Sequence, residues 1–230
     1  LITNLYKDPS GNIWVNQNGE LDILDSNLAY KYRFTDLDWA KSLKGILIRF
    51  EKCYTDQKKR LWLPADQSSL AIIDFNKKEI RYANNNPENA SYLKKTYIRS
   101  FLMDEKTNTL WYSPWGLGLI KYDFNSRTEQ QVLFGMNEIS ENRTINSILK
   151  TATGKIVCAG SENIYEVDPS TLEYKKAFSK TDINEKTTNQ IYNNTLINSS
   201  ASNYWAGTTQ GLIYFSSEIP KWTELTLSTK

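Results

Sequence analysis

A stretch near the middle of the chain, LWYSPWGLGLIKYDF at residues 110–124, combines residue types that serve two kinds of binding site. Gly116-Leu117-Gly118 resembles part of the glycine-rich loops that cradle phosphates. Trp111 and Trp115 carry aromatic faces of the kind that stack on sugar rings. The stretch therefore suggests a nucleotide loop, a sugar-binding patch or one unit of a repeating scaffold.

The phosphate interpretation fails on the neighbouring residues. A dinucleotide loop needs a third glycine and a following helix, and a P-loop needs Gly-Lys-Ser/Thr; neither follows Gly118. The sequence predicts that Gly116 and Gly118 belong to a turn between two strands.

The remaining reactive residues also indicate structure rather than catalysis. The chain has no histidine, which removes the commonest general base and the imidazole metal ligand. Its two cysteines, Cys53 and Cys158, lie in apolar segments and are expected to be buried free thiols. No calcium-loop motif is present, so we expect no cofactor and no metal.

Four acids recur at one position, each after an apolar segment and before turn-forming residues: Asp25, Asp74, Asp123 and Asp168. A catalytic carboxylate pair needs two unlike environments, whereas these acids share one. Repetition at one register predicts that each side chain accepts hydrogen bonds from its own turn.

An internal repeat organises the whole chain. Five segments align on an apolar anchor with a period of about 48 residues, and the anchors are Trp14, Trp62, Trp111, Val157 and Trp205. Each unit contains four short apolar segments separated by hairpin signals. This pattern is typical of the blades of a β-propeller, in which the repeated tryptophan fills the space between stacked blades.

The predicted fold is therefore all-β: a β-propeller region at 1–230 with about five four-stranded antiparallel blades. The predicted blades are 1–44, 45–94, 95–138, 139–183 and 184–230, as part of a larger propeller. One helical candidate, DLDWAKSL at 36–43, predicts one or two turns of helix on a loop.

The segments GNIWV, TLWYS and WAGTTQGLIYF resemble the propeller repeat of two-component regulators. In the family pattern an Asp and a Gly precede the anchor tryptophan. The fourth repeat departs from this pattern because Val157 replaces the tryptophan, and the fifth repeat lacks the Asp and the Gly before Trp205. The resemblance implies a non-enzymatic periplasmic sensor region of a Bacteroidetes-type hybrid histidine kinase, responding to an oligosaccharide. It also implies a homodimer in the full-length protein, with the kinase and membrane segment outside this chain. The start at Leu1 is expected to reflect a fragment.

The net charge of the chain bears on one class of partner. The chain has 28 Lys+Arg against 26 Asp+Glu, a net charge of +2, so nothing favours nucleic acid as a partner.

Trp115 stands out because no other repeat has an aromatic residue in the corresponding turn. The predicted ligand-binding residues are Trp115, its neighbour Tyr112, and Trp39 in a connecting loop. Trp111 is assigned to the scaffold. Two alternatives stay open: a propeller glycosidase or lyase, which needs two converging carboxylates, and an architectural protein-interaction propeller.

Overall fold

The computed structural model describes residues 2–8, 10–17, 20–46, 53–65, 69–83, 97–132, 134–135, 144–160, 163–179, 193–200, 203–208, 211–216 and 223–225. The chain divides into two compact units, Leu1–Ile98 (unit 1) and Arg99–Lys230 (unit 2). Each unit is described by itself.

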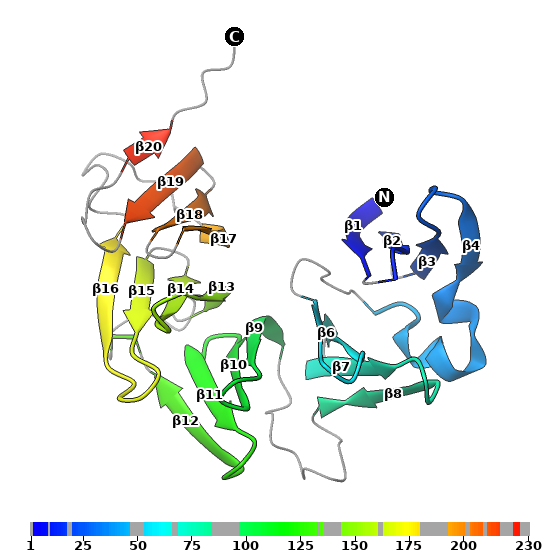
Figure 1. Ribbon diagram of the computed structural model, residues 1–230, viewed down its shortest axis with the longest axis horizontal. Helices are drawn as coiled ribbons and strands as arrows, with labels where there is room; N and C mark the ends of the chain where they lie inside the picture. The colour runs from blue at the N-terminus through cyan, green and yellow to red at the C-terminus, as the bar shows by residue number, and fades with distance from the viewer. Residues whose placement is uncertain are drawn as a thin grey trace. The chain divides into compact units, whose positions relative to one another are not determined.

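The chain is all-β and forms five four-stranded antiparallel β-propeller blades, in each of which consecutive strands are neighbours (Figure 1). Blade 1 contains β1 Ile2–Lys7, β2 Ile13–Gln17, β3 Glu20–Leu24 and β4 Tyr30–Arg33. Blade 2 contains β5 Tyr54–Thr55, β6 Leu61–Ala65, β7 Ser69–Asp74 and β8 Glu79–Tyr82. These two blades make up the sheets of unit 1.

Unit 2 holds the other three blades. Blade 3 contains β9 Ile98–Asp104, β10 Thr109–Pro114, β11 Leu119–Asp123 and β12 Thr128–Val132. Blade 4 contains β13 Ile145–Lys150, β14 Ile156–Gly160, β15 Asn163–Val167 and β16 Tyr174–Ser179. Blade 5 contains β17 Asn193–Ser200, β18 Asn203–Thr208, β19 Gly211–Ser216 and β20 Thr223–Leu225.

The recurring acids close the turns between the third and fourth strands of blades 1 to 4. Oδ1 of Asp25 accepts hydrogen bonds from the backbone N–H groups of Asn27 and Ala29, at 2.8 and 2.9 Å. The same oxygen of Asp74, Asp123 and Asp168 accepts bonds from backbone N–H groups two and three residues further on. The predicted turn role of these acids is confirmed.

The repeated tryptophans lie in the cores. Trp14, Trp62 and Trp111 are all buried, as an inter-blade filler must be, and Trp205 is partly buried against Tyr214. Val157, which replaces tryptophan in blade 4, is also buried. Val157 therefore keeps the apolar role of the anchor.

Unit 1 has a loop that helps to join its two blades. The predicted helical segment at 36–43 contains the 3-10 helix η2 Asp38–Leu43 and begins at the last residue of a second one, η1 Phe34–Asp36. Ala40 and Leu43 of η2 are buried in the shared core, and the hydroxyl of Tyr82 in blade 2 donates to the carbonyl of Ser42 at 3.1 Å.

Serine hydroxyls link neighbouring blades of unit 2. The backbone N–H of Ile145 in β13 donates to Oγ of Ser113 in β10 at 3.0 Å. The N–H of Leu196 in β17 donates to Oγ of Ser147 in β13 at 3.1 Å. Such bonds satisfy buried backbone donors that the sheets leave unpaired.

In blades 3 and 4 the fourth strand is more exposed than the first. Every residue of β13 except Lys150 is buried, whereas the first four residues of β12 are all exposed. β4 is similarly exposed along most of its length. The fourth strand is therefore the solvent-facing edge of these blades.

Candidate functional site

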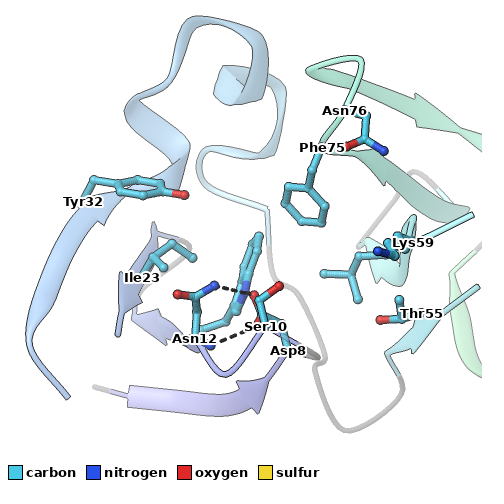
Figure 2. Close-up of a pocket in the computed structure, with 11 residues that line it drawn as sticks. Asp8, Ser10, Asn12, Ile23, Tyr32, Thr55, Lys59, Phe75 and Asn76 are labelled. Atoms are coloured by element: carbon cyan, nitrogen blue, oxygen red, sulfur yellow. Dashed lines mark hydrogen bonds between the residues drawn. The ribbon is translucent and has the colours of Figure 1, made fainter. Parts of the chain in front are cut away.

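A cavity of about 360 Å³ lies within unit 1, between residues of blade 1 and residues of blade 2 (Figure 2). The turn from β1 to β2 and the strand β4 supply one side. The turns from β5 to β6 and from β7 to β8 supply the other. Its volume lies in the range of about 300–1,000 Å³ that is typical of small-molecule sites.

Asp8 organises the floor of this pocket. Its Oδ1 accepts the backbone N–H of Asn12, and its Oδ2 accepts Nδ2 of Asn12 and the indole N–H of Trp14, at 2.9 and 3.1 Å. The Asn12 side chain is thereby fixed, and its Oδ1 accepts a bond from Nζ of Lys31 at 3.1 Å. Asp8 is therefore a structural anchor that orients a polar amide.

Two aromatic side chains flank the opening. Tyr32 of β4 is 41% exposed, and Phe75 in the turn after β7 is 38% exposed. The ring of Phe75 packs edge-on against Trp14, with the ring centroids 5.6 Å apart, so it is held in place from across the blade boundary. Burial and, to a lesser degree, the nearby Asp8 raise the pKa of Tyr32, which keeps its hydroxyl neutral.

Polar side chains complete the wall that faces Tyr32. Figure 2 shows Thr55 and Lys59 on the blade 2 side, with Asn76 beside Phe75. Oγ1 of Thr55 shares a hydrogen bond with the hydroxyl of Tyr6 in blade 1 at 3.0 Å. Aromatic faces combined with hydroxyl, amide and ammonium groups suit a polyhydroxylated ligand such as a sugar.

Of the three residues predicted from the sequence, Trp39 belongs to unit 1, and Trp115 and Tyr112 belong to unit 2. Trp115, in the turn after β10, is 50% exposed, and its ring lies 5.0 Å from the guanidinium carbon of Arg99. Trp39 belongs to unit 1 and packs against the core, edge-on to Phe34 at 5.0 Å between ring centroids. Trp39 does not line the pocket.

Tyr112 lies in the core of unit 2. Its side chain is fully buried in β10, and its hydroxyl donates to the carboxylate of Glu129. The prediction that Tyr112 contacts a ligand does not fit this placement, because a buried ring cannot stack on a molecule arriving from solvent. Trp111 and Tyr112 point to opposite faces of β10, and both faces are buried.

The pocket was missed in the sequence because its residues are scattered. They come from three turns and five strands, and the polar types among them are common in turns throughout the chain. Two of them belong to the repeat: Trp14 as its anchor, and Asp8 as the acid six residues before that anchor. Phe75 directly follows a recurring acid and carried no signal of its own.

In the part of the chain that the structure describes, no three His, Cys, Asp or Glu side chains gather as a metal site would require. No helix among the described residues is long and apolar enough to cross a membrane.

Comparisons with known proteins place the fold. No protein-family profile and no curated protein sequence matches the chain. The structure is similar to the extracellular domain of the hybrid two component system BT4673 from B. thetaiotaomicron, with a TM-score of 0.69 and 13% identity over 100% of this chain and 30% of that one. It is also similar to the extracellular domain of the hybrid two component system BT3049 from the same organism, with a TM-score of 0.69 and 16% identity over 99% of this chain and 28% of that one.

A third similar structure is PorZ, a surface component of the type-IX secretion system of Porphyromonas gingivalis, with a TM-score of 0.56 and 13% identity over 99% of this chain and 27% of that one. The chain thus spans less than a third of the length of these proteins. At such low identity the likeness establishes the β-propeller fold, and this chain is structurally similar to the extracellular propeller domains of Bacteroides two-component systems.

Proposed function

We propose that the chain is a non-enzymatic ligand-sensing part of a two-component regulator that faces the periplasm and binds an oligosaccharide. The observation that carries this proposal is the pocket of unit 1, which combines two exposed aromatic rings with fixed polar groups. The likeness to extracellular domains of B. thetaiotaomicron two-component systems supports the proposed role in such a regulator and the proposed periplasmic location.

The carboxylates at the pocket favour binding over catalysis. Glycoside hydrolysis usually needs two carboxyl groups on either side of the scissile bond. Among the described residues that line the pocket, Asp8 is the sole carboxylate, and both its oxygens accept hydrogen bonds from Asn12 and Trp14. A carboxylate held in this way orients its neighbours.

The position of the pocket suggests how binding would be transmitted. Tyr32 and Asn12 come from blade 1, whereas Phe75, Asn76 and Lys59 come from blade 2. A ligand that contacts both blades favours the arrangement in which they are packed, and this difference in affinity is what shifts a conformational equilibrium.

The test is calorimetric titration of the chain with a panel of neutral oligosaccharides. Tyr32→Ala is expected to lower the affinity of any saccharide that binds by about threefold to tenfold, as one aromatic contact is lost. Tyr30→Ala is the matched control, because Tyr30 lies on the same strand, is more exposed, and does not line the pocket.

Equal losses in the two tyrosine variants would show that binding lies elsewhere. Failure of every saccharide to bind the folded protein would overturn the proposed function.

A further inference from the structure

A second cluster of polar and aromatic residues lies in unit 2, where the turn after β10 meets the first strands of blades 3 and 4. Trp115 in the turn is half exposed, and the guanidinium carbon of Arg99 in β9 lies 5.0 Å from its ring centroid. A guanidinium at this distance from an indole ring is attracted to the π electrons of the ring. Arg99 and Trp115 therefore hold one another in place.

The turn that carries Trp115 is anchored to blade 4. The backbone N–H of Gly116 donates to Oγ1 of Thr144 at 3.1 Å, and the N–H of Leu117 donates to the carbonyl of Pro114 at 3.2 Å. Ser113, just before the turn, accepts the N–H of Ile145. The indole is thus presented on a fixed support.

Asn146 supplies the observation that points to a ligand. It is 7% exposed, and its Oδ1 accepts Nε of Arg99 at 3.3 Å. Its Nδ2 is buried and has no hydrogen-bond partner among the residues that the structure describes. Buried polar groups in folded proteins are almost always paired, so an unpaired amide donor beside a guanidinium calls for an acceptor from outside the chain.

A β-bulge accounts for the direction of this side chain. Ile145 pairs with Gly160 and Ser147 pairs with Ala159, so Asn146 is the extra residue between them. Such bulges re-aim a side chain and recur next to functional sites. Here the bulge aligns the Asn146 amide with Arg99.

We infer that Arg99, Asn146 and Trp115 form a binding site for a carboxylate-bearing saccharide, such as a sugar acid. Arg99 and Nδ2 of Asn146 supply adjacent N–H donors, which match the two acceptor oxygens of a carboxylate. The exposed part of the Trp115 indole supplies an apolar face for the sugar ring. This site consists of unit 2 residues and does not depend on the pocket of unit 1.

The experiment titrates the 230-residue chain with sodium glucuronate, glucose and sodium acetate, followed by calorimetry and by intrinsic tryptophan fluorescence. Glucuronate is expected to bind more tightly than either of the other two probes. Arg99→Gln is expected to weaken glucuronate binding by at least about tenfold, because hydrogen bonds to a charged group are lost. Trp115→Ala is expected to bring the affinity for glucuronate down to that for acetate.

Asn146→Asp gives a sharper test, since its carboxylate keeps the acceptor for Arg99 and replaces the unpaired donor by a negative charge. It is expected to fold and to lose glucuronate binding. Lys121→Gln is the matched control, because Lys121 also lies beside a tryptophan of blade 3, with Nζ 5.6 Å from the ring centroid of the buried Trp111.

Several results would overturn the inference. One is the absence of glucuronate binding to the folded wild-type protein at millimolar concentrations. Another is equal affinity for glucuronate and glucose, which would remove the role of the carboxylate. Equal affinity for glucuronate and acetate would remove the role of Trp115, and undiminished binding in Asn146→Asp would place the site elsewhere.

Discussion

The indole N–H of Trp62 donates a hydrogen bond to Oδ2 of Asp56 at 2.9 Å. The same relationship, six residues apart, joins Trp14 to Asp8 in blade 1. In both blades the acid ends or follows the first strand, and the tryptophan lies near the start of the second. The repeated tryptophan therefore fills the core and also ties its own hairpin to the acid before it.

This pair predicts a coupled loss of stability. The Asp56 side chain is 8% exposed and also accepts bonds from the backbone N–H and side chain of Arg60. Asp56→Ala is expected to lower the free energy of unfolding by about 1–3 kcal/mol, because the buried Trp62 N–H loses its acceptor. A double-mutant cycle with Trp62→Phe, measured by urea unfolding, is expected to show non-additivity.

The control for this cycle is Glu79→Ala in the same blade. Glu79 pairs with Arg81 on the surface, and exposed ion pairs contribute little to stability. Strict additivity between Asp56 and Trp62 would mean that the bond contributes nothing to the fold.

Acid is expected to destabilise unit 1 through Asp56. Burial raises the pKa of this carboxyl, but hydrogen bonds from Trp62 and Arg60 outweigh burial and leave the pKa below its ordinary value. The stabilisation is therefore present above the unfolded pKa of about 3.9 and is lost as the pH falls through the folded pKa. Urea unfolding at pH 7 and pH 3 measures the difference, which is expected to be smaller in Asp56→Asn.

Asp104 is expected to have the same effect in unit 2. Burial raises the pKa of its carboxyl, and the bonds from Lys150 and Thr107 lower it further than burial raises it. Nζ of Lys150 lies 2.5 Å from Oδ2 of Asp104. A pH dependence of unfolding that is unchanged in Asp104→Asn would contradict this assignment.

Gly118 is expected to be intolerant of any side chain. Its φ is +74°, and a Cβ added there would lie 2.7 Å from the backbone oxygen of Val132. Gly118→Ala is expected to cost about 2–4 kcal/mol, from left-handed backbone strain and a clash with backbone. Thermal unfolding followed by circular dichroism measures this loss.

Gly154 separates the two contributions, because its φ is +87° and an added Cβ meets nothing within 4 Å. Gly154→Ala lies in the same unit and is expected to cost about 1–2 kcal/mol from strain alone. Equal costs at the two glycines would show that the β10–β11 turn relaxes away from Val132.

The two cysteines are expected to differ in reactivity. Cys158 is fully buried, and burial raises the pKa of its thiol, so little reactive thiolate forms. Cys53 is partly buried. A thiol reagent followed by mass spectrometry is expected to label Cys53 in the native protein and Cys158 only on unfolding; rapid native labelling of Cys158 would contradict its burial.

The scaffold was predictable from the sequence because the same structural residues recur at the same positions of successive repeats. Phased tryptophans and strand-end acids recur in most blades, so Trp111 and Asp123 were assigned correctly from their copies. The two proposed binding sites were not predictable in this way, because most of their residues depart from the repeat. Trp115 was visible as such a departure, but Arg99 and Asn146 come together only through the packing of blade 3 against blade 4 and a bulge in β13. Tyr112 misled because β10 is buried on both of its faces, so the residue next to the buried Trp111 is buried as well.

The exposed fourth strands affect how these blades meet other molecules. Such an edge has unpaired N–H and C=O groups and is a template for aggregation by lateral strand addition. Here the edges carry charge on exposed or partly exposed positions, with Lys31 and Arg33 on β4, Glu129 on β12, and Lys175 and Lys176 on β16. An incoming copy of the same strand would meet like charges. The charged edges thus oppose fibril-like growth and leave association to the loops at the ends of the strands.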